Sequence, residues 1–188
     1  MKTVLFVNAC VRKGSRTLSL AKYLLEKLDG NICEEKLEDL VFPQINERFL
    51  ELRDGLVKKR EFDDPIFSPA NRFAEADEIV VAAPFWDLSF PSILKQYFEQ
   101  INVLGITFTY SRNGIPQSLC KAGKLYYVAT AGGFIAESEY GFGYVNALAK
   151  GFYGINETHF IKAEGLDIDG ANVDEIIANA KKDIDSLF

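Results

Sequence analysis

Three segments of this 188-residue chain carry side chains that could bind a ligand, and each follows an apolar run typical of a buried strand. They are residues 9–17, 83–91 and 130–134. The carboxyl ends of parallel strands meet at one edge of a sheet, and open α/β sheets bind their ligands at this edge. We therefore expect the three segments to meet in a single site.

The first segment places hydroxyl and basic side chains at the start of a helical pattern, where Ser15, Arg16 and Thr17 follow Arg12 and Lys13. A helix N-terminus binds anions because its free N–H groups and its dipole both favour negative charge. The segment has neither a Walker motif nor the G-x-G-x-x-G pattern of dinucleotide sites. It predicts a site for one phosphate monoester or, alternatively, ordinary helix caps formed by Ser15 and Thr17.

The second segment is rich in aromatic residues and has a proline near each end. Its central residues are Pro84, Phe85, Trp86, Asp87 and Leu88. Aromatic side chains at the ligand-binding edge of a sheet are typical of a wall that covers a flat ligand. The same rings could instead close the top of the hydrophobic core, and composition alone leaves both interpretations open.

The third segment contains Thr130, Ala131, Gly132 and Gly133. Paired glycines allow backbone N–H groups to approach a ligand closely, although a tight strand-to-helix turn would use them as well. Together the three segments would supply a phosphate socket, an aromatic wall and a floor of backbone groups. A flat, aromatic, singly phosphorylated ligand fits this combination, and FMN is the natural candidate.

The elements that must position these segments alternate between strands and helices. Strands are predicted at residues 3–8, 32–37, 78–83, 124–131 and 157–163. Helices are predicted at residues 17–28, 46–59, 71–76, 91–103, 144–152 and 173–187. This alternation predicts one α/β domain over residues 1–188, a three-layer sandwich whose five-stranded parallel sheet has helices on both faces. Five strands favour a flavodoxin-like strand order.

One stretch, residues 105–116, does not fit the repeat. Its Thr107-Phe108-Thr109-Tyr110 run alternates like a short strand, and Asn113-Gly114 is a strong turn signal. Long excursions near an active edge are often functional. The role of residues 44–70, as a lid, a dimer contact or both, stays open.

Composition limits the possible function classes. A net charge of -6 argues against nucleic-acid binding, which requires a basic surface. No apolar run approaches the ~20 residues of a membrane span, and the first run is too short for a signal peptide, so we expect a cytoplasmic protein without membrane contact. Cys10, Cys33 and Cys120 lie far apart and His159 is the only histidine. This pattern predicts neither a metal site nor a catalytic side-chain triad.

At these motifs the chain resembles the flavodoxin-like NAD(P)H:quinone oxidoreductases, and most closely the FMN-dependent NADH-azoreductases. Ser15-Arg16-Thr17 is similar to the family's Ser-x-Ser/Thr phosphate motif, and residues 83–91 to its Ala-Pro-Met-Tyr-Asn-Phe-x-x-Pro flavin loop. Gly132-Gly133 stands at its Gly-Gly loop. Residues 105–114 resemble its Gly-x-Thr-Phe-x-Tyr-x-x-Asn-Gly segment, which explains the excursion.

The resemblance implies bound FMN, NADH or NADPH as electron donor, and ping-pong two-electron reduction of quinones or azo compounds. The flavin would carry the chemistry, so no side chain is expected to be catalytic. The resemblance also implies a homodimer with the active site at its interface, and Tyr110 and Phe134 as a wall for the substrate.

Three departures from the family pattern bear on substrate preference. Asp87 stands where the family has Asn, Phe85-Trp86 replaces Met-Tyr, and Ala9 replaces a serine. A carboxylate of Asp87 near the flavin N5 would disfavour the anionic reduced flavin, whereas contact through its backbone would change little. Two other classes remain open, a flavodoxin-type one-electron carrier and a regulatory relative without cofactor.

Overall fold

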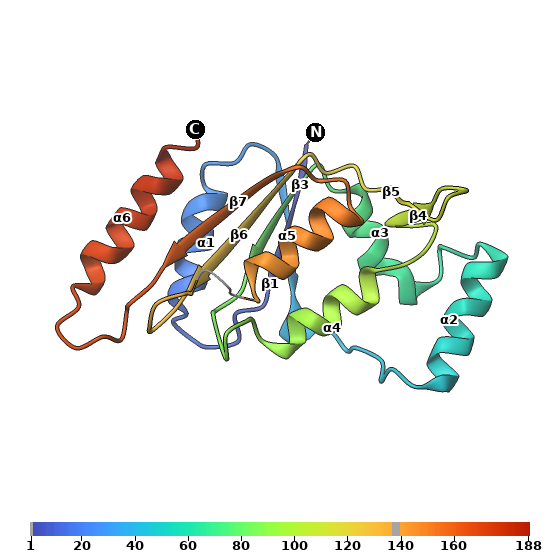
Figure 1. Ribbon diagram of the computed structural model, residues 1–188, viewed down its shortest axis with the longest axis horizontal. Coiled ribbons are helices and arrows are strands. Elements are labelled where there is room, and N and C mark those ends of the chain that lie inside the picture. Colours follow the sequence, from blue (N-terminus) through green and yellow to red (C-terminus); the bar gives the residue numbers. More distant parts are fainter. Residues whose placement is uncertain (1, 137–139) are drawn as a thin grey trace.

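The computed structural model describes residues 2–136 and 140–188. Its centre is a five-stranded parallel sheet in the order β2-β1-β3-β6-β7 (Figure 1). The strands are β1 (Thr3–Asn8), β2 (Asn31–Lys36), β3 (Glu78–Ala82), β6 (Lys124–Thr130) and β7 (Glu157–Ala163). Counted within the sheet alone, this order is 2-1-3-4-5, so the predicted flavodoxin-like fold class is confirmed.

Helices cover both faces of the sheet (Figure 1). One layer consists of α1 (Arg16–Leu25) and α6 (Val173–Asp185), and the other of α3 (Ser68–Glu75), α4 (Ser92–Ile101) and α5 (Phe142–Gly151). Successive strand residues point to opposite faces, so β1 serves both layers. Val4 and Phe6 pack with the first layer, and Leu5 and Val7 with the second.

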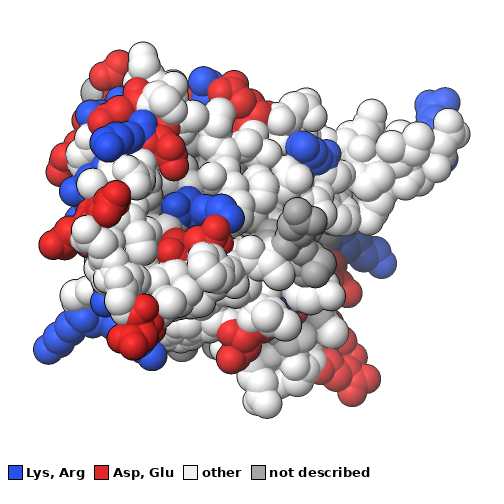
Figure 2. Space-filling model, turned by 60° about the vertical axis from the view of Figure 1, so that its left-hand side comes forward, with Lys and Arg blue, Asp and Glu red and all other residues white. Residues whose placement is uncertain are grey.

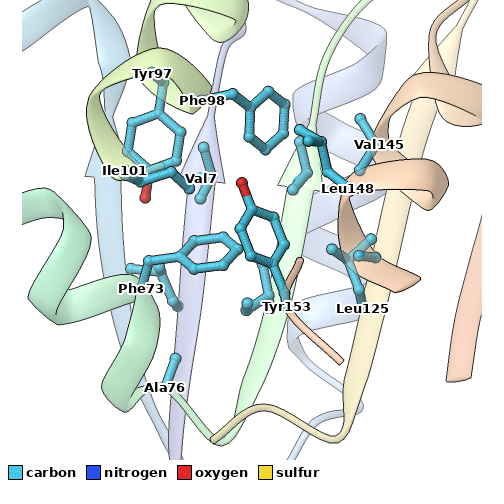
Figure 3. Packing of buried hydrophobic residues seen from close by; sticks show 14 of the residues in the cluster. Val7, Phe73, Ala76, Tyr97, Phe98, Ile101, Leu125, Val145, Leu148 and Tyr153 are labelled. Carbon is cyan, nitrogen blue, oxygen red and sulfur yellow. The ribbon is translucent and has the colours of Figure 1, made fainter. Parts of the chain in front are cut away.

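Aromatic side chains fill the core between the sheet and the second layer (Figure 3). The ring centroids of Phe73 and Tyr153 lie 4.7 Å apart. The hydroxyl of Tyr153 donates a hydrogen bond to Asn102 Oδ1 at 2.7 Å, and that of Tyr97 donates to Glu35 Oε2 at 2.7 Å. The rings therefore contribute apolar area while their polar ends stay hydrogen-bonded, as buried tyrosines require.

The excursion forms a hairpin-like arm, an antiparallel pair of β4 (Phe108–Tyr110) and β5 (Pro116–Ser118), with the expected short strand and turn in its first half. The fully buried Thr107 anchors its base, because its hydroxyl donates to the carbonyl of Ile101 at 2.7 Å. The arm therefore starts from a fixed point at the end of α4.

A peripheral segment lies between β2 and α3. It contains two 3₁₀ turns, η1 (Leu37–Asp39) and η2 (Pro65–Phe67), and the helix α2 (Glu47–Lys59), which lies at the edge of the molecule (Figure 1). Phe49 is the one buried residue of α2. The helix is therefore held by few core contacts.

Several predicted boundaries were wrong, although each predicted element exists. The helix expected at residues 17–28 ends at Leu25, where the chain leaves the α1 axis in a turn. The helix expected from residue 71 begins at Ser68, because proline is tolerated in a first turn and Pro69 lies there. The helix expected from residue 144 begins two residues earlier, at Phe142.

Candidate functional site

A cleft of about 790 Å³ lies at the carboxyl ends of β1, β3 and β6. It brings the three predicted segments together. The predicted residues that line it are Ser15, Arg16, Thr17, Pro84, Phe85, Trp86, Asp87, Thr130, Ala131 and Gly132. Leu88 and Gly133 belong to the same loops but do not line the cleft. Its volume is within the about 300–1,000 Å³ typical of small-molecule sites.

The N-terminus of α1 forms one end of the cleft. Ser15 is the N-cap, and its Oγ accepts from the Leu18 amide at 3.2 Å. The amides of Arg16 and Thr17 lie in the first turn, where a helix offers no carbonyl partner. Ser15 therefore caps the helix, as one of the two interpretations predicts, and the capped end faces the cleft, where phosphate binding stays a prediction.

A buried hydrogen bond joins the first segment to the third. Thr17 Oγ1 and Thr130 Oγ1 lie 2.6 Å apart, and both residues are buried. One hydroxyl proton occupies this bond, so the other hydroxyl keeps its proton for a further acceptor. The pair fixes α1 against the end of β6 and holds one donor at the cleft.

Two arginines of the first segment have partners in other loops. Arg16 Nη1 lies 2.9 Å from Asp167 Oδ1, and the guanidinium of Arg12 lies 5.2 Å from the centroid of the Trp86 ring. Both Arg16 and Asp167 are substantially exposed, so this ion pair contributes little to stability. Its role is to orient Arg16 across the cleft.

Asp167 is a site residue that sequence reasoning missed. Its amide donates to the Gly132 carbonyl at 2.9 Å, and its carboxylate lies where a Cβ at Gly132 would collide with it. Gly132 is therefore needed for the approach of Asp167. The available signal was the position of Asp167 just after the last predicted strand, at the same edge as the other loops.

The second segment forms a tight turn. Trp86 and Ser89 exchange two backbone hydrogen bonds of 3.0 and 2.8 Å, and the central residues have left-handed φ angles, 50° at Asp87 and 66° at Leu88. Left-handed backbone at both central positions is the type I′ arrangement, which normally selects Asn or Gly. The backbone amides of Asp87 and Leu88 take no part in these two hydrogen bonds.

Cys10 lines the floor of the cleft and was not predicted there. Its Sγ donates to the Ala82 carbonyl at 3.7 Å, and its amide donates to Asn8 Oδ1 at 2.9 Å. Burial raises the pKa of the Cys10 thiol to about 11, against a smaller opposing effect of the Ser15 hydroxyl. The thiol is therefore neutral at pH 7.

Tyr110 and Phe134 lie outside the cleft of their own chain. Tyr110 is 49% exposed on the arm, and Phe134 is 75% exposed just beyond the glycine loop. Their predicted role as a substrate wall stays a prediction. His159 is also outside the cleft, where its ring stacks on Tyr126 with the centroids 5.0 Å apart.

Charges of both signs are intermingled on the face in Figure 2, without a large region of one sign. Among the residues that the structure describes, no group of three or more His, Cys, Asp or Glu could hold a metal ion. Across the same residues, no helix has both the length and the apolar character that a membrane span demands.

The fold defines an open α/β protein with a cleft at the carboxyl edge of its sheet. A family model described as "Flavodoxin-like fold" matches residues 2–188, and the chain belongs to this family. An FMN-dependent NADH:quinone oxidoreductase of Clostridium beijerinckii is 34% identical, with 96% of this chain and 94% of that protein covered. A protein of the same name from Coprothermobacter proteolyticus is 31% identical, with 100% and 98% covered.

Solved structures agree on the fold. A crystal structure of an azoreductase from Bacillus anthracis superimposes with a TM-score of 0.86 at 24% identity, covering 100% of this chain and 98% of that chain. A second structure, an FMN-dependent NADH-azoreductase from Bacillus anthracis in complex with FMN, gives a TM-score of 0.82 at 23% identity, with 100% and 97% covered.

Replacing Leu88 by Gly should stabilise the protein. The left-handed backbone costs a residue with a side chain about 1–2 kcal/mol, and the 60% exposed Leu88 side chain loses little packing. We expect the free energy of unfolding in urea to rise by about 1 kcal/mol. The matched control is Leu52→Gly, at an exposed position inside α2. This change should lower the free energy of unfolding by about 1 kcal/mol. A loss at both positions would contradict the strained turn.

Alkylation by iodoacetamide should distinguish the cysteines. The thiolate is the reactive form, and burial raises the pKa of Cys10 to about 11 and that of Cys120 to about 12. Mass spectrometry at pH 8 should find Cys33 modified first, with Cys10 modified only as the pH approaches 11. Equal rates for Cys10 and Cys33 at pH 8 would refute the neutral, buried thiol.

Proposed function

We propose that this protein is an FMN-dependent NAD(P)H oxidoreductase that reduces quinones or azo compounds. The observation that carries the proposal is the single cleft that joins the anion-binding end of α1 to the aromatic turn at Trp86. The relatives named as FMN-dependent NADH:quinone oxidoreductases match this chain over nearly its whole length, which supports it.

The residues present fit FMN at both ends. For the phosphate, the cleft offers the first-turn amides of α1, the hydroxyl of Ser15 and the guanidinium of Arg16. For the flat ring system it offers Phe85, Trp86 and the backbone of the turn. When bound, FMN supplies hydride and two-electron transfer between NAD(P)H and the acceptor. The protein itself has to bind the flavin, orient it and shield it from solvent.

Within the cleft, the side chains have positioning roles. Arg12 lies over the Trp86 ring and restrains it by a cation–π contact. Asp87 is exposed, so water screens its carboxylate, and its backbone rather than its charge is offered to the flavin ring. This arrangement favours the interpretation in which the exchange of Asn for Asp changes little.

Ping-pong turnover belongs to the same proposal, and the flavin cleft supports it. Donor and acceptor both need access to the same ring face, and we propose that they occupy it in turn. Burial raises the pKa of Cys10 to about 11, which makes its thiol a poor acid at pH 7, and His159 lies elsewhere, so neither serves as the proton donor. Solvent would supply the proton at the open side of the cleft.

A homodimer with the active site at its interface belongs to the same proposal. Three large apolar side chains are exposed close to the cleft loops: Leu88 at 60%, Phe134 at 75% and Tyr140 at 65%. The Tyr140 amide donates to the Leu88 carbonyl at 3.0 Å, so two of them lie on adjoining backbone. A second copy covering them could bring its Tyr110 to the substrate, as the wall prediction requires.

A cytoplasmic location completes the proposal. All three cysteines are free. Free thiols are the usual state in a reducing compartment, and disulfides the usual state outside it.

Anaerobic absorbance spectroscopy of the purified protein with added FMN tests the activity. Bound flavin should bleach on addition of NADH, and a quinone should restore its absorbance. Flavin that binds but is not reduced by NADH would favour an electron carrier. A protein that binds no FMN would refute the assignment of the cleft.

The Ser15→Ala variant tests the phosphate end. Losing one hydrogen bond to a charged group costs about 1.5–3 kcal/mol, so FMN should bind roughly ten- to hundredfold more weakly in a fluorescence titration. The variant also loses the α1 cap, and the matched control is therefore Asn172→Ala, which removes the cap of α6. The control should lose similar stability and keep its FMN affinity. Unchanged affinity in both variants would place the phosphate elsewhere.

A further inference from the structure

A second cavity of about 500 Å³ lies beside the edge strand β2, on the side of α3 and α4. It shares no residue with the flavin cleft. Its walls are mostly apolar, and its polar side chains are few. The apolar lining consists of Leu40, Val41, Phe42, Pro43, Pro65, Ile66 and Pro69, and the polar lining of Ser68, Arg72 and Gln100.

Gln100 is the unusual member of this lining. It lies in the last turn of α4 and is only 7% exposed. Among the described residues, none gives its side-chain amide a hydrogen bond, although the amide has two donors and an acceptor. Buried side-chain amides in folded proteins nearly always have a partner. The Gln100 amide has no protein partner in the part of the chain that the structure describes and reaches the open space of the cavity, so it is available to pair with a ligand there.

Arg72 brings further donors to the same cavity. Its Nε donates to Glu35 Oε1 at 2.9 Å, its Nη2 contacts the same oxygen, and its Nη1 donates to Ser68 Oγ at 2.6 Å. A guanidinium has five N–H groups, so two remain for a ligand. Arg72 is a lining residue with 39% of its side chain exposed, which leaves these groups accessible.

The charge of Arg72 is already balanced. Glu35 is 4% exposed, and its second oxygen accepts from the Tyr97 hydroxyl at 2.7 Å. The pair is neutral as a unit, so an anionic ligand would find no net positive charge to compensate its own. A neutral ligand with an acceptor oxygen needs no such compensation.

We propose that this cavity binds a neutral aromatic carboxamide. The carbonyl of such a ligand accepts from the NH₂ group of Gln100 and from the free N–H groups of Arg72. The NH₂ group of the ligand donates to the side-chain oxygen of Gln100, and its ring lies against the apolar walls. A carboxamide ligand thus pairs with the Gln100 amide both as a hydrogen-bond donor and as an acceptor.

Titration of the FMN-loaded, ¹⁵N-labelled protein with benzamide tests the proposal. We expect the side-chain NH₂ signals of Gln100 and the Nε–H signal of Arg72 to shift with a millimolar Kd, while the flavin absorbance stays constant. Benzoate should bind at least tenfold more weakly, because it is charged and lacks the N–H donors. Protein purified without flavin serves equally, since the two sites share no residue.

Gln100→Leu should weaken benzamide binding at least tenfold. The matched control is Gln96→Leu, at an exposed position of the same helix, which should leave binding unchanged. Benzamide that shifts only the flavin absorbance, or that binds equally to Gln100→Leu, would overturn the proposal. An absence of binding at benzamide concentrations up to about 50 mM would overturn it as well. A different result would also show that the proposal is wrong. If the protein is an oligomer that does not bind benzamide, and Gln100→Leu makes it dissociate, the cavity is an interface between copies.

Discussion

Parallel pairing of three strands is the constraint on which the rest of the site depends. The registers place Asn8, Ala82 and Val128 side by side in β1, β3 and β6. The segments that follow them therefore emerge at the same edge, although they are far apart in sequence. The hydrogen bond between Thr17 and Thr130, which are 113 residues apart, then fixes the helix after β1 against the end of β6.

Much of this arrangement could be predicted from the sequence, because strands buried on both faces are continuous apolar runs. The runs around Val80 and Val128 are of this kind, and they located the edge and its loops. What could not be predicted depends on contacts between distant segments. Asp167 meets Gly132 only once β6 and β7 have paired, and Gln100 and Arg72 line one cavity only because α4 packs beside α3.

Local signals can also mislead when a backbone is strained. A type I′ turn is normally indicated by Gly at its second central position, but here Leu88 occupies that position after Asp87, so the sequence did not predict the turn. The paired glycines were expected to make room for a ligand, whereas Gly132 makes room for Asp167. Ala9, expected to cost a phosphate donor, is completely buried, so a hydroxyl there would face the core. At these positions the sequence shows the residue type but not the neighbours that each residue contacts in the fold.

The ion pair between Arg16 and Asp167 affects how fast an anion arrives. Before binding, the positive charge of Arg16 is part of a closely spaced dipole, whose field falls with distance more steeply than that of a lone charge. The protein as a whole carries -6 and repels an anion from afar. Arg16 therefore adds little to the long-range steering of a phosphorylated ligand and leaves that role to Arg12 and Lys13, which also line the cleft. Its own part in capture is confined to contacts made on arrival.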